Sequence, residues 1–205
     1  MSALDLHVHR WEPAARPGLP TLLLLHGTGG DENDLVPLGR TLRPGAAMLS
    51  VRGNVLEHGA PRFFRRLAEG VFDIPDLHKR TGELADFIEA SSARYGFPLE
   101  SLHAVGYSNG ANIAASVLLT RPSVLAGGVL LRAMVPFEGG SVPSMAGKRV
   151  LLSAGKFDQM IPRAGTERLA AILRDAGAEV ELVWQQASHG LTQADVDVAT
   201  AFLGA

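Results

Sequence analysis

The chain has 205 residues, of which 46% are hydrophobic and 20% charged, and its formal net charge is -2. A chain of this length and composition is most simply one globular domain spanning residues 1–205. The small net charge excludes a strong field for nucleic acid or an acidic membrane. The absence of cysteine excludes disulfides, thiolate catalysis and cysteine-ligated metal.

The first ten residues of the chain include four charged or histidine side chains. Asp5, His7, His9 and Arg10 interrupt any apolar segment of the kind that a signal peptide needs. The wholly apolar run at residues 22–25 is far too short to span a bilayer. We therefore expect a cytoplasmic protein with no stable membrane anchoring and no nucleic-acid partner. The sequence leaves a homodimer open.

Strand and helix patterns alternate from the N-terminus. Residues 4–8 alternate apolar and polar side chains, which predicts a half-buried edge strand with His7 and His9 on a solvated face, without a third ligand for a metal. Residues 21–25 form an unbroken apolar run, typical of a strand buried on both faces. Residues 34–42 predict a short helix capped by Asp34, and residues 46–51 predict the next strand.

Residues 52–75 fit no regular element. Glycines and prolines surround the cluster Arg62-Phe63-Phe64-Arg65-Arg66, and we expect an excursion over the sheet here. Two readings of this cluster stay open. Its arginines are solvated above buried Phe63 and Phe64, or the cluster is a pocket wall that contacts substrate.

The second half of the chain continues the alternation. Helices are predicted near residues 76–95, 109–120, 168–173 and 194–203, and strands near 102–107, 126–131, 150–154 and 180–184. This order predicts an α/β fold with a mostly parallel central sheet, helices on both faces and ligands at the carboxyl ends of the strands.

A Gly-x-Ser-x-Gly motif lies between one of these strands and its helix. Gly106 and Gly110 flank Ser108 at two residues on either side, as in a nucleophile elbow, where a tight turn exposes the serine. A serine hydroxyl is a poor nucleophile at neutral pH, so it needs a histidine base and a carboxylate that orients the histidine.

Chain order selects the partners of Ser108. On a sheet of this kind the triad follows the order serine, acid, histidine, and only His189 of the seven histidines comes after Ser108. Of the six carboxylates between the two, Asp158 lies in a loop directly after a strand and is the preferred acid, with Glu138 as the alternative.

An acyl-transfer site also needs donors for the developing oxyanion. The backbone N–H of Asn109 opens the helix after the elbow, and the glycine-rich loop after residues 21–25 supplies a second donor, with Thr28 preferred over Gly29. His26 is expected to support that loop by hydrogen bonding. Met134, Met160, Ile161 and Leu191 lie on loops at the same face and form either an apolar acyl pocket or part of the core.

Four motifs together resemble a known family. Leu25-His26-Gly27-Thr28-Gly29-Gly30, Gly106-Tyr107-Ser108-Asn109-Gly110, the Gly155 to Pro162 segment and Ser188-His189-Gly190 are similar to the small carboxylesterase, lysophospholipase and acyl-protein thioesterase family of α/β-hydrolases. Asn109 and Ala111, where the commonest family pattern has Gln and Gly, and the cluster at 62–66 resemble a bacterial branch that includes hydroquinone-associated carboxylesterases.

The resemblance implies cofactor-free hydrolysis through an acyl-serine, with no metal, on a fold with a minimal lid or none. It carries the triad onto Ser108, Asp158 and His189, and the oxyanion donors onto Thr28 and Asn109. We expect a serine carboxylesterase acting on small to medium esters, with Phe63 and Phe64 among its substrate contacts. The alternatives are an acyl-protein thioesterase or lysophospholipase with the same triad, and a non-catalytic binding protein on the same fold.

Overall fold

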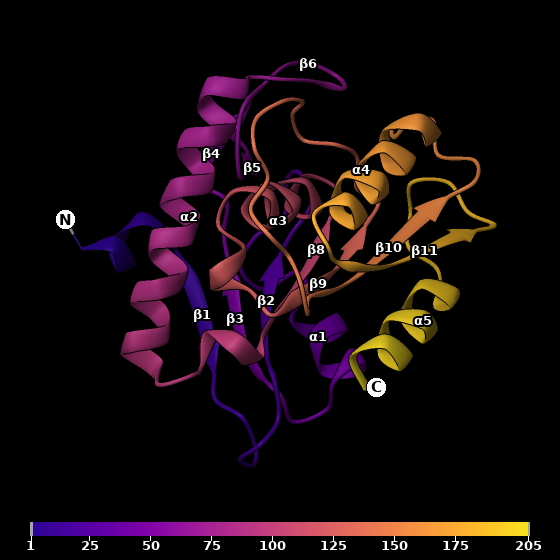
Figure 1. The fold of residues 1–205 in the computed structure, drawn as a ribbon. Helices are drawn as coiled ribbons and strands as arrows, with labels where there is room; N and C mark the ends of the chain where they lie inside the picture. The colour runs from indigo at the N-terminus through magenta and orange to yellow at the C-terminus, as the bar shows by residue number, and fades with distance from the viewer. Residues whose placement is uncertain (1, 205) are drawn as a thin grey trace.

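The structure is a computed structural model that describes residues 2–204. Its centre is a seven-stranded sheet in the order β1-β3-β2-β8-β9-β10-β11, which crosses the middle of Figure 1. The strands are β1 (His9–Glu12), β2 (Thr21–Leu25), β3 (Ala47–Val51), β8 (Leu102–Tyr107), β9 (Gly127–Leu131), β10 (Arg149–Gly155) and β11 (Glu179–Gln185). Only β1 pairs antiparallel with its neighbour. The predicted α/β fold with a mostly parallel sheet is confirmed.

Helices cover both faces of the sheet (Figure 1). They are α1 (Val36–Leu42), α2 (Ile74–Tyr95), α3 (Asn109–Thr120), α4 (Arg163–Asp175) and α5 (Gln193–Gly204), with 3-10 turns η1 (Ala3–Leu6), η2 (Leu99–Ser101) and η3 (Pro122–Val124). The strand β2 divides its leucines between two cores: Leu23 and Leu25 pack with α2, α3 and α4, and Leu22 and Leu24 pack with α1 and α5. This is the period of two that places alternate side chains on opposite faces.

The start of the chain differs from the prediction. Residues 3–6 form η1, because Ser2 accepts a hydrogen bond from the N–H of Leu4 and Asp5 accepts one from the N–H of Ser2. This capping box favours a helical turn over an edge strand. His7 is buried edge-on against Phe87. The predicted solvated face is therefore wrong for His7, and His9 is half-buried against the same ring.

The helix α1 begins without the predicted cap. It starts after Leu35, and no side chain, Asp34 included, bonds its first N–H groups. The long helix α2 begins at Ile74, two residues before the predicted start, because Asp73 accepts a hydrogen bond from Asp76 N–H. Gly96 ends it in the left-handed region with φ of 73°.

The excursion at 52–75 contains two short hairpins in place of irregular loop. They are β4 (Val55–Glu57) with β5 (Ala60–Arg62), and β6 (Arg66–Ala68) with β7 (Val71–Phe72). Each hairpin pairs only with itself and not with the central sheet. Positive φ angles at Gly59 and Gly70 supply the turns. Within residues 2–204, no helix has both the length and the apolar character that a membrane crossing would require.

Candidate active site

Ser108 lies on a sharp turn between β8 and α3, with φ of 52° and ψ of -113°. A Cβ atom at Gly106 would lie 2.6 Å from the carbonyl oxygen of Gly110. A Cβ atom at Gly110 would collide with the carbonyl oxygen of Leu25 on the neighbouring strand. The turn therefore needs glycine at both flanking positions, and its backbone strain holds the serine at the carboxyl end of the sheet.

His189 lies between Ser108 and Asp158. Its Nε2 is 2.9 Å from Ser108 Oγ, and its Nδ1 is 2.8 Å from Asp158 Oδ2. When Nδ1 donates its proton to the carboxylate, Nε2 is left free to accept the proton of the serine hydroxyl. The structure thus brings together Ser108, selected from its motif, His189, selected from chain order, and Asp158, selected from its loop position.

The loop after β10 fixes the carboxylate of Asp158. Its Oδ1 accepts hydrogen bonds from the N–H groups of Met160 and Ile161, at 2.8 and 3.1 Å, so Oδ2 is the oxygen directed at His189. Glu138, the alternative acid, is exposed on the surface and pairs with Arg168. Geometry therefore favours Asp158 over Glu138.

The loop that carries His189 is held at three consecutive carbonyl groups. Arg132 donates to the carbonyls of Ser188 and Gly190, at 3.1 and 2.7 Å, and the hydroxyl of Tyr107 donates to the carbonyl of His189 at 3.2 Å. Tyr107 immediately precedes the serine in the elbow. The backbone of His189 is therefore tied directly to the strand that presents Ser108.

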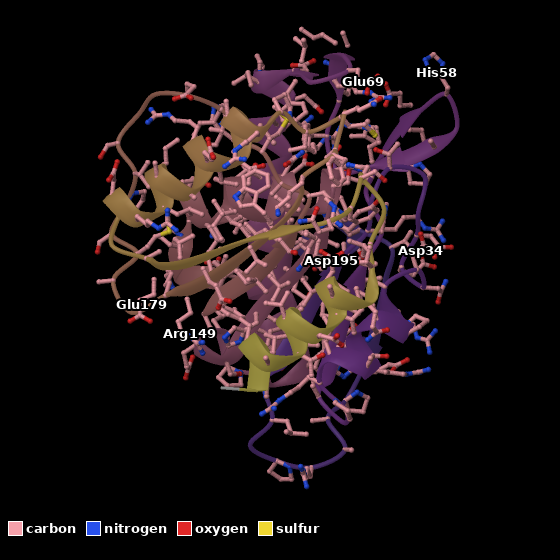
Figure 2. All side chains as sticks on the ribbon, turned by 90° about the vertical axis from the view of Figure 1, so that its right-hand side faces the viewer. Asp34, His58, Glu69, Arg149, Glu179 and Asp195 are labelled. Carbon is pink, nitrogen blue, oxygen red and sulfur yellow. The ribbon has the colours of Figure 1, made fainter. Side chains whose placement is uncertain are left out.

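Arg132 was not singled out by the sequence analysis, although it follows directly on the apolar strand β9. Its side chain is fully buried, and all five of its N–H groups are used. Besides the two loop carbonyls, it bonds the carbonyl of Ser153 and both carboxylate oxygens of Asp195. Figure 2 shows Asp195 at the inner start of α5.

Asp195 is itself fully bonded. It also accepts hydrogen bonds from the Ser153 hydroxyl and from the N–H and hydroxyl of Thr192. Burial by itself would raise the pKa of this carboxyl, but the hydrogen bonds from Arg132, Ser153 and Thr192 outweigh it and hold the pKa below its usual value. Asp195 is therefore a stable counterion for Arg132.

Two backbone amides at the site have no carbonyl partner. The N–H of Thr28 bonds no carbonyl of residues 2–204, whereas the N–H of Gly29 donates to Pro61. Asn109 is the first residue of α3, where amides lack an intrahelical acceptor and the dipole favours an anion. Geometry therefore favours the amide of Thr28 over that of Gly29, which is already bonded, as a donor to an oxyanion.

His26 supports the loop that carries Thr28. Its Nε2 accepts the N–H of Gly53 at 2.9 Å, so its Nδ1 is the protonated nitrogen that donates to the carbonyl of Gly27. Burial lowers the pKa of His26, which keeps the ring neutral in this arrangement. The expected supporting hydrogen bonds of His26 are present.

A pocket opens beside Ser108. It is lined by Thr28, Arg62, Arg66, Glu69, Gly70, Phe72, Ser108, Asn109, Asn112, Met134, Met160 and Ile161. Three of the predicted substrate contacts, Met134, Met160 and Ile161, belong to this wall. Arg62 and Arg66 belong to it as well, which supports the pocket-wall reading for these two arginines.

Three other predicted substrate contacts lie elsewhere. Phe63 and Phe64 are fully buried in the core; Phe63 packs on His26 and Phe64 meets Phe72 edge-on. The N–H of Phe63 donates to the side-chain oxygen of Asn109, so this segment is hydrogen-bonded to the residue that follows Ser108 in the elbow. Leu191 packs against the core under α1 and α5. The prediction of substrate contact is wrong for Phe63, Phe64 and Leu191.

Known proteins resemble this chain over most of its length. MhqD of Bacillus subtilis (strain 168), whose assignment as a hydrolase is provisional, is 51% identical over 178 residues, or 87% of this chain and 89% of MhqD. No protein-family model matches the chain.

Solved structures give the same picture. The carboxylesterase of Bacillus cereus superposes with a TM-score of 0.95 at 45% identity, covering 97% of this chain and 94% of the other. The carboxylesterase of Mesorhizobium loti superposes with a TM-score of 0.91 at 30% identity, covering 97% of this chain and 95% of the other.

Proposed function

The chain belongs to the carboxylesterase family of α/β-hydrolases, and we propose that it hydrolyses small to medium carboxylic esters through an acyl-serine intermediate. The observation that carries the serine mechanism is the hydrogen-bonded series Ser108, His189 and Asp158 at the mouth of a pocket.

In the first half-reaction Ser108 Oγ attacks the ester carbonyl carbon while His189 Nε2 takes the hydroxyl proton. The C=O electron pair moves to the oxygen and forms a tetrahedral oxyanion. When that pair returns, the bond to the alkoxy group breaks and His189 gives its proton to the departing alcohol. Asp158 holds the imidazole in the productive tautomer and stabilises its protonated form.

In the second half-reaction water attacks the acyl-serine, and His189 removes one of its protons. Collapse of the second tetrahedral oxyanion breaks the bond to Ser108 Oγ, which regains a proton from His189. The carboxylic acid leaves, and the site returns to its starting state. The amides of Thr28 and Asn109 bind the oxyanion in both halves, where each such donor contributes about 100- to 1000-fold in rate.

A panel of p-nitrophenyl esters of increasing acyl length tests this proposal. We expect turnover that is highest for short and medium acyl chains, because the short hairpins of residues 52–75 leave the site at Ser108 shallow and partly open. Ser108→Ala is expected to abolish turnover and labelling by a fluorophosphonate, with an unchanged circular dichroism spectrum. No turnover of any chain length, or full activity in Ser108→Ala, would contradict the proposal.

Long-chain thioester or lysophospholipid hydrolysis is the second candidate. Met160 lines the pocket and is 41% accessible, and the β6–β7 hairpin, which contributes Arg66 and Phe72 to the pocket, also carries the exposed apolar side chains Leu67 and Val71, 73% and 50% accessible. A long acyl chain could lie along them. Comparing kcat/KM for palmitoyl thioesters and short oxygen esters separates the two functions. The cytoplasmic location and the homodimer stay predictions.

A further inference from the structure

We propose that the ester recognised at this site carries a free carboxylate, which Arg62 and Arg66 bind in the pocket beside Ser108. This inference rests on the proposed function and specifies its substrate class. Half-esters of short dicarboxylic acids and acyl esters of short hydroxy acids have the required chemistry.

Arg62 is a buried cation whose terminal hydrogen-bonding edge is only partly used. Its side chain is 4% accessible and lines the same pocket as Ser108. One terminal nitrogen, Nη1, donates to the hydroxyl of Thr28, and Nε donates to the carbonyl of Phe64. The other, Nη2, donates to no group within residues 2–204. The terminal edge of a guanidinium matches a carboxylate, which it binds through two parallel N–H groups.

The charges around Arg62 are unbalanced. Glu57 is its ion-pair partner, at 3.2 Å from Nε, and the same carboxylate also pairs with Nε of Arg66 at 3.0 Å. Two guanidinium groups therefore share one carboxylate. Burial and the neighbouring charge of Arg66 lower the pKa of Arg62, whereas Glu57 raises it. With one carboxylate between two cations, the pair is short of one negative charge. A substrate carboxylate would supply it.

Among the described residues that line the pocket, Glu69 is the one acidic residue. It is exposed, it bonds neither arginine, and it lies at the outer edge of the molecule in Figure 2. Solvent screens an exposed charge far more than a buried one. The inner part of the pocket is therefore positive, and its remaining inner wall is formed by Asn112 and by the apolar side chains of Met134 and Ile161.

Two matched pairs of esters test the proposal. Monoethyl succinate is compared with ethyl 4-methylpentanoate for a charge on the acyl side, and acetoxyacetate with isobutyl acetate for a charge on the alcohol side. In each pair an isopropyl group replaces the carboxylate at nearly equal size. Steady-state kcat/KM is measured for the full chain, Arg66→Gln and the control Arg65→Gln. Arg65 is exposed, lies outside this pocket and pairs with Asp73.

We expect Arg66→Gln to lower kcat/KM for the charged ester of at least one pair about tenfold more than for its neutral partner, the size expected for a charge-assisted hydrogen bond. Arg65→Gln is expected to change neither. Added NaCl should weaken only the charged reaction. Equal losses for both esters of both pairs in Arg66→Gln would overturn the proposal. If the unmodified chain still hydrolyses the neutral esters in that case, the esterase function itself stands. If the unmodified chain hydrolyses none of the four esters, the esterase function is contradicted.

Discussion

Arg132 and Asp195 form a buried ion pair, 2.7 Å between Nη1 and Oδ1, and the same guanidinium bonds the carbonyls on both sides of His189. The pair joins the end of β9 to the start of α5 and places the histidine loop between them. A positive φ of 59° at Arg132 lets the side chain turn back under that loop. We therefore expect both stability and catalysis to depend on this one network.

Asp195→Asn is expected to destabilise the protein by about 3–5 kcal/mol, because it leaves the charge of Arg132 buried without a counterion. Urea unfolding followed by circular dichroism measures the change. Asp197→Asn is the matched control, since Asp197 lies on the same helix and bonds only the exposed Gln193. A loss below about 1 kcal/mol in Asp195→Asn would show that the buried pair is dispensable, by the size that ordinary surface changes have.

Arg132→Lys separates positioning from stability. Lysine keeps the charge beside Asp195, but its single nitrogen does not span the carbonyls of Ser188 and Gly190. We expect kcat to fall about 10- to 100-fold with little change in KM, because a misplacement of about 1 Å costs that much in a catalytic geometry. Steady-state kinetics on p-nitrophenyl acetate tests this, and an unchanged kcat would rule out the positioning role.

Asp158→Asn is expected to lower kcat about 10,000-fold, because an amide at this position no longer fixes the tautomer of His189. Glu138→Gln is the control, since Glu138 pairs with Arg168 on the surface. Its kcat should stay within about twofold of the unmodified chain, as for other surface substitutions. A large loss in Glu138→Gln together with a small one in Asp158→Asn would reverse the assignment of the acid.

Gly110→Ala is expected to lower both stability and activity, because the new Cβ would overlap the carbonyl of Leu25 and push the elbow away from β2. Gly82→Ala, within α2, has no atom near the new Cβ and should stabilise the protein by about 0.5–1 kcal/mol. Thermal unfolding and esterase assays on the two variants give the comparison. If Gly110→Ala behaves like Gly82→Ala, the elbow tolerates a side chain.

Stability is expected to rise from pH 5 to pH 7. Burial lowers the pKa values of His7, His26 and His103, so at mildly acidic pH the unfolded chain binds more protons than the folded one. This stabilises the unfolded state as pH falls below about 6.5, by up to about 1.4 kcal/mol per pH unit for each histidine. Above that pH these histidines are neutral in both the folded and the unfolded state, so they no longer make stability depend on pH.

Urea unfolding at pH 5, 6 and 7 measures this slope. His26→Gln is expected to reduce it, whereas His58→Gln should leave it unchanged because His58 is exposed on the tip of the β4–β5 hairpin (Figure 2). A flat profile for the unmodified chain would contradict the assignment of these histidines as neutral buried groups.

The sequence predicted those parts of the molecule in which local pattern and tertiary structure agree. The apolar run at 21–25 is the central strand β2, and the loops after two further strands carry Asp158 and His189 to Ser108. Chain order alone selected this histidine, because the α/β topology admits no earlier one.

Other features depend on contacts that no local pattern encodes. Arg132 and Asp195 are 63 residues apart, and nothing in either segment indicates the other. Phe63 and Phe64 lie among arginines, and this pattern fits phenylalanine side chains that point either into the core or toward solvent. The contact that fixes the segment is the hydrogen bond from the N–H of Phe63 to the side chain of Asn109. At residues 3–6 the alternating pattern predicted a strand, and this prediction was wrong because a capping box of two short side chains outweighs the pattern.

The β6–β7 hairpin forms part of the pocket wall, yet its strands pair through backbone hydrogen bonds with each other and not with the central sheet. Lengthening or shortening it changes no register in the central sheet and moves none of Ser108, Asp158 and His189. Substrate preference in this protein can therefore be altered by exchanging the β6–β7 hairpin alone, while the positions of the three triad residues stay the same.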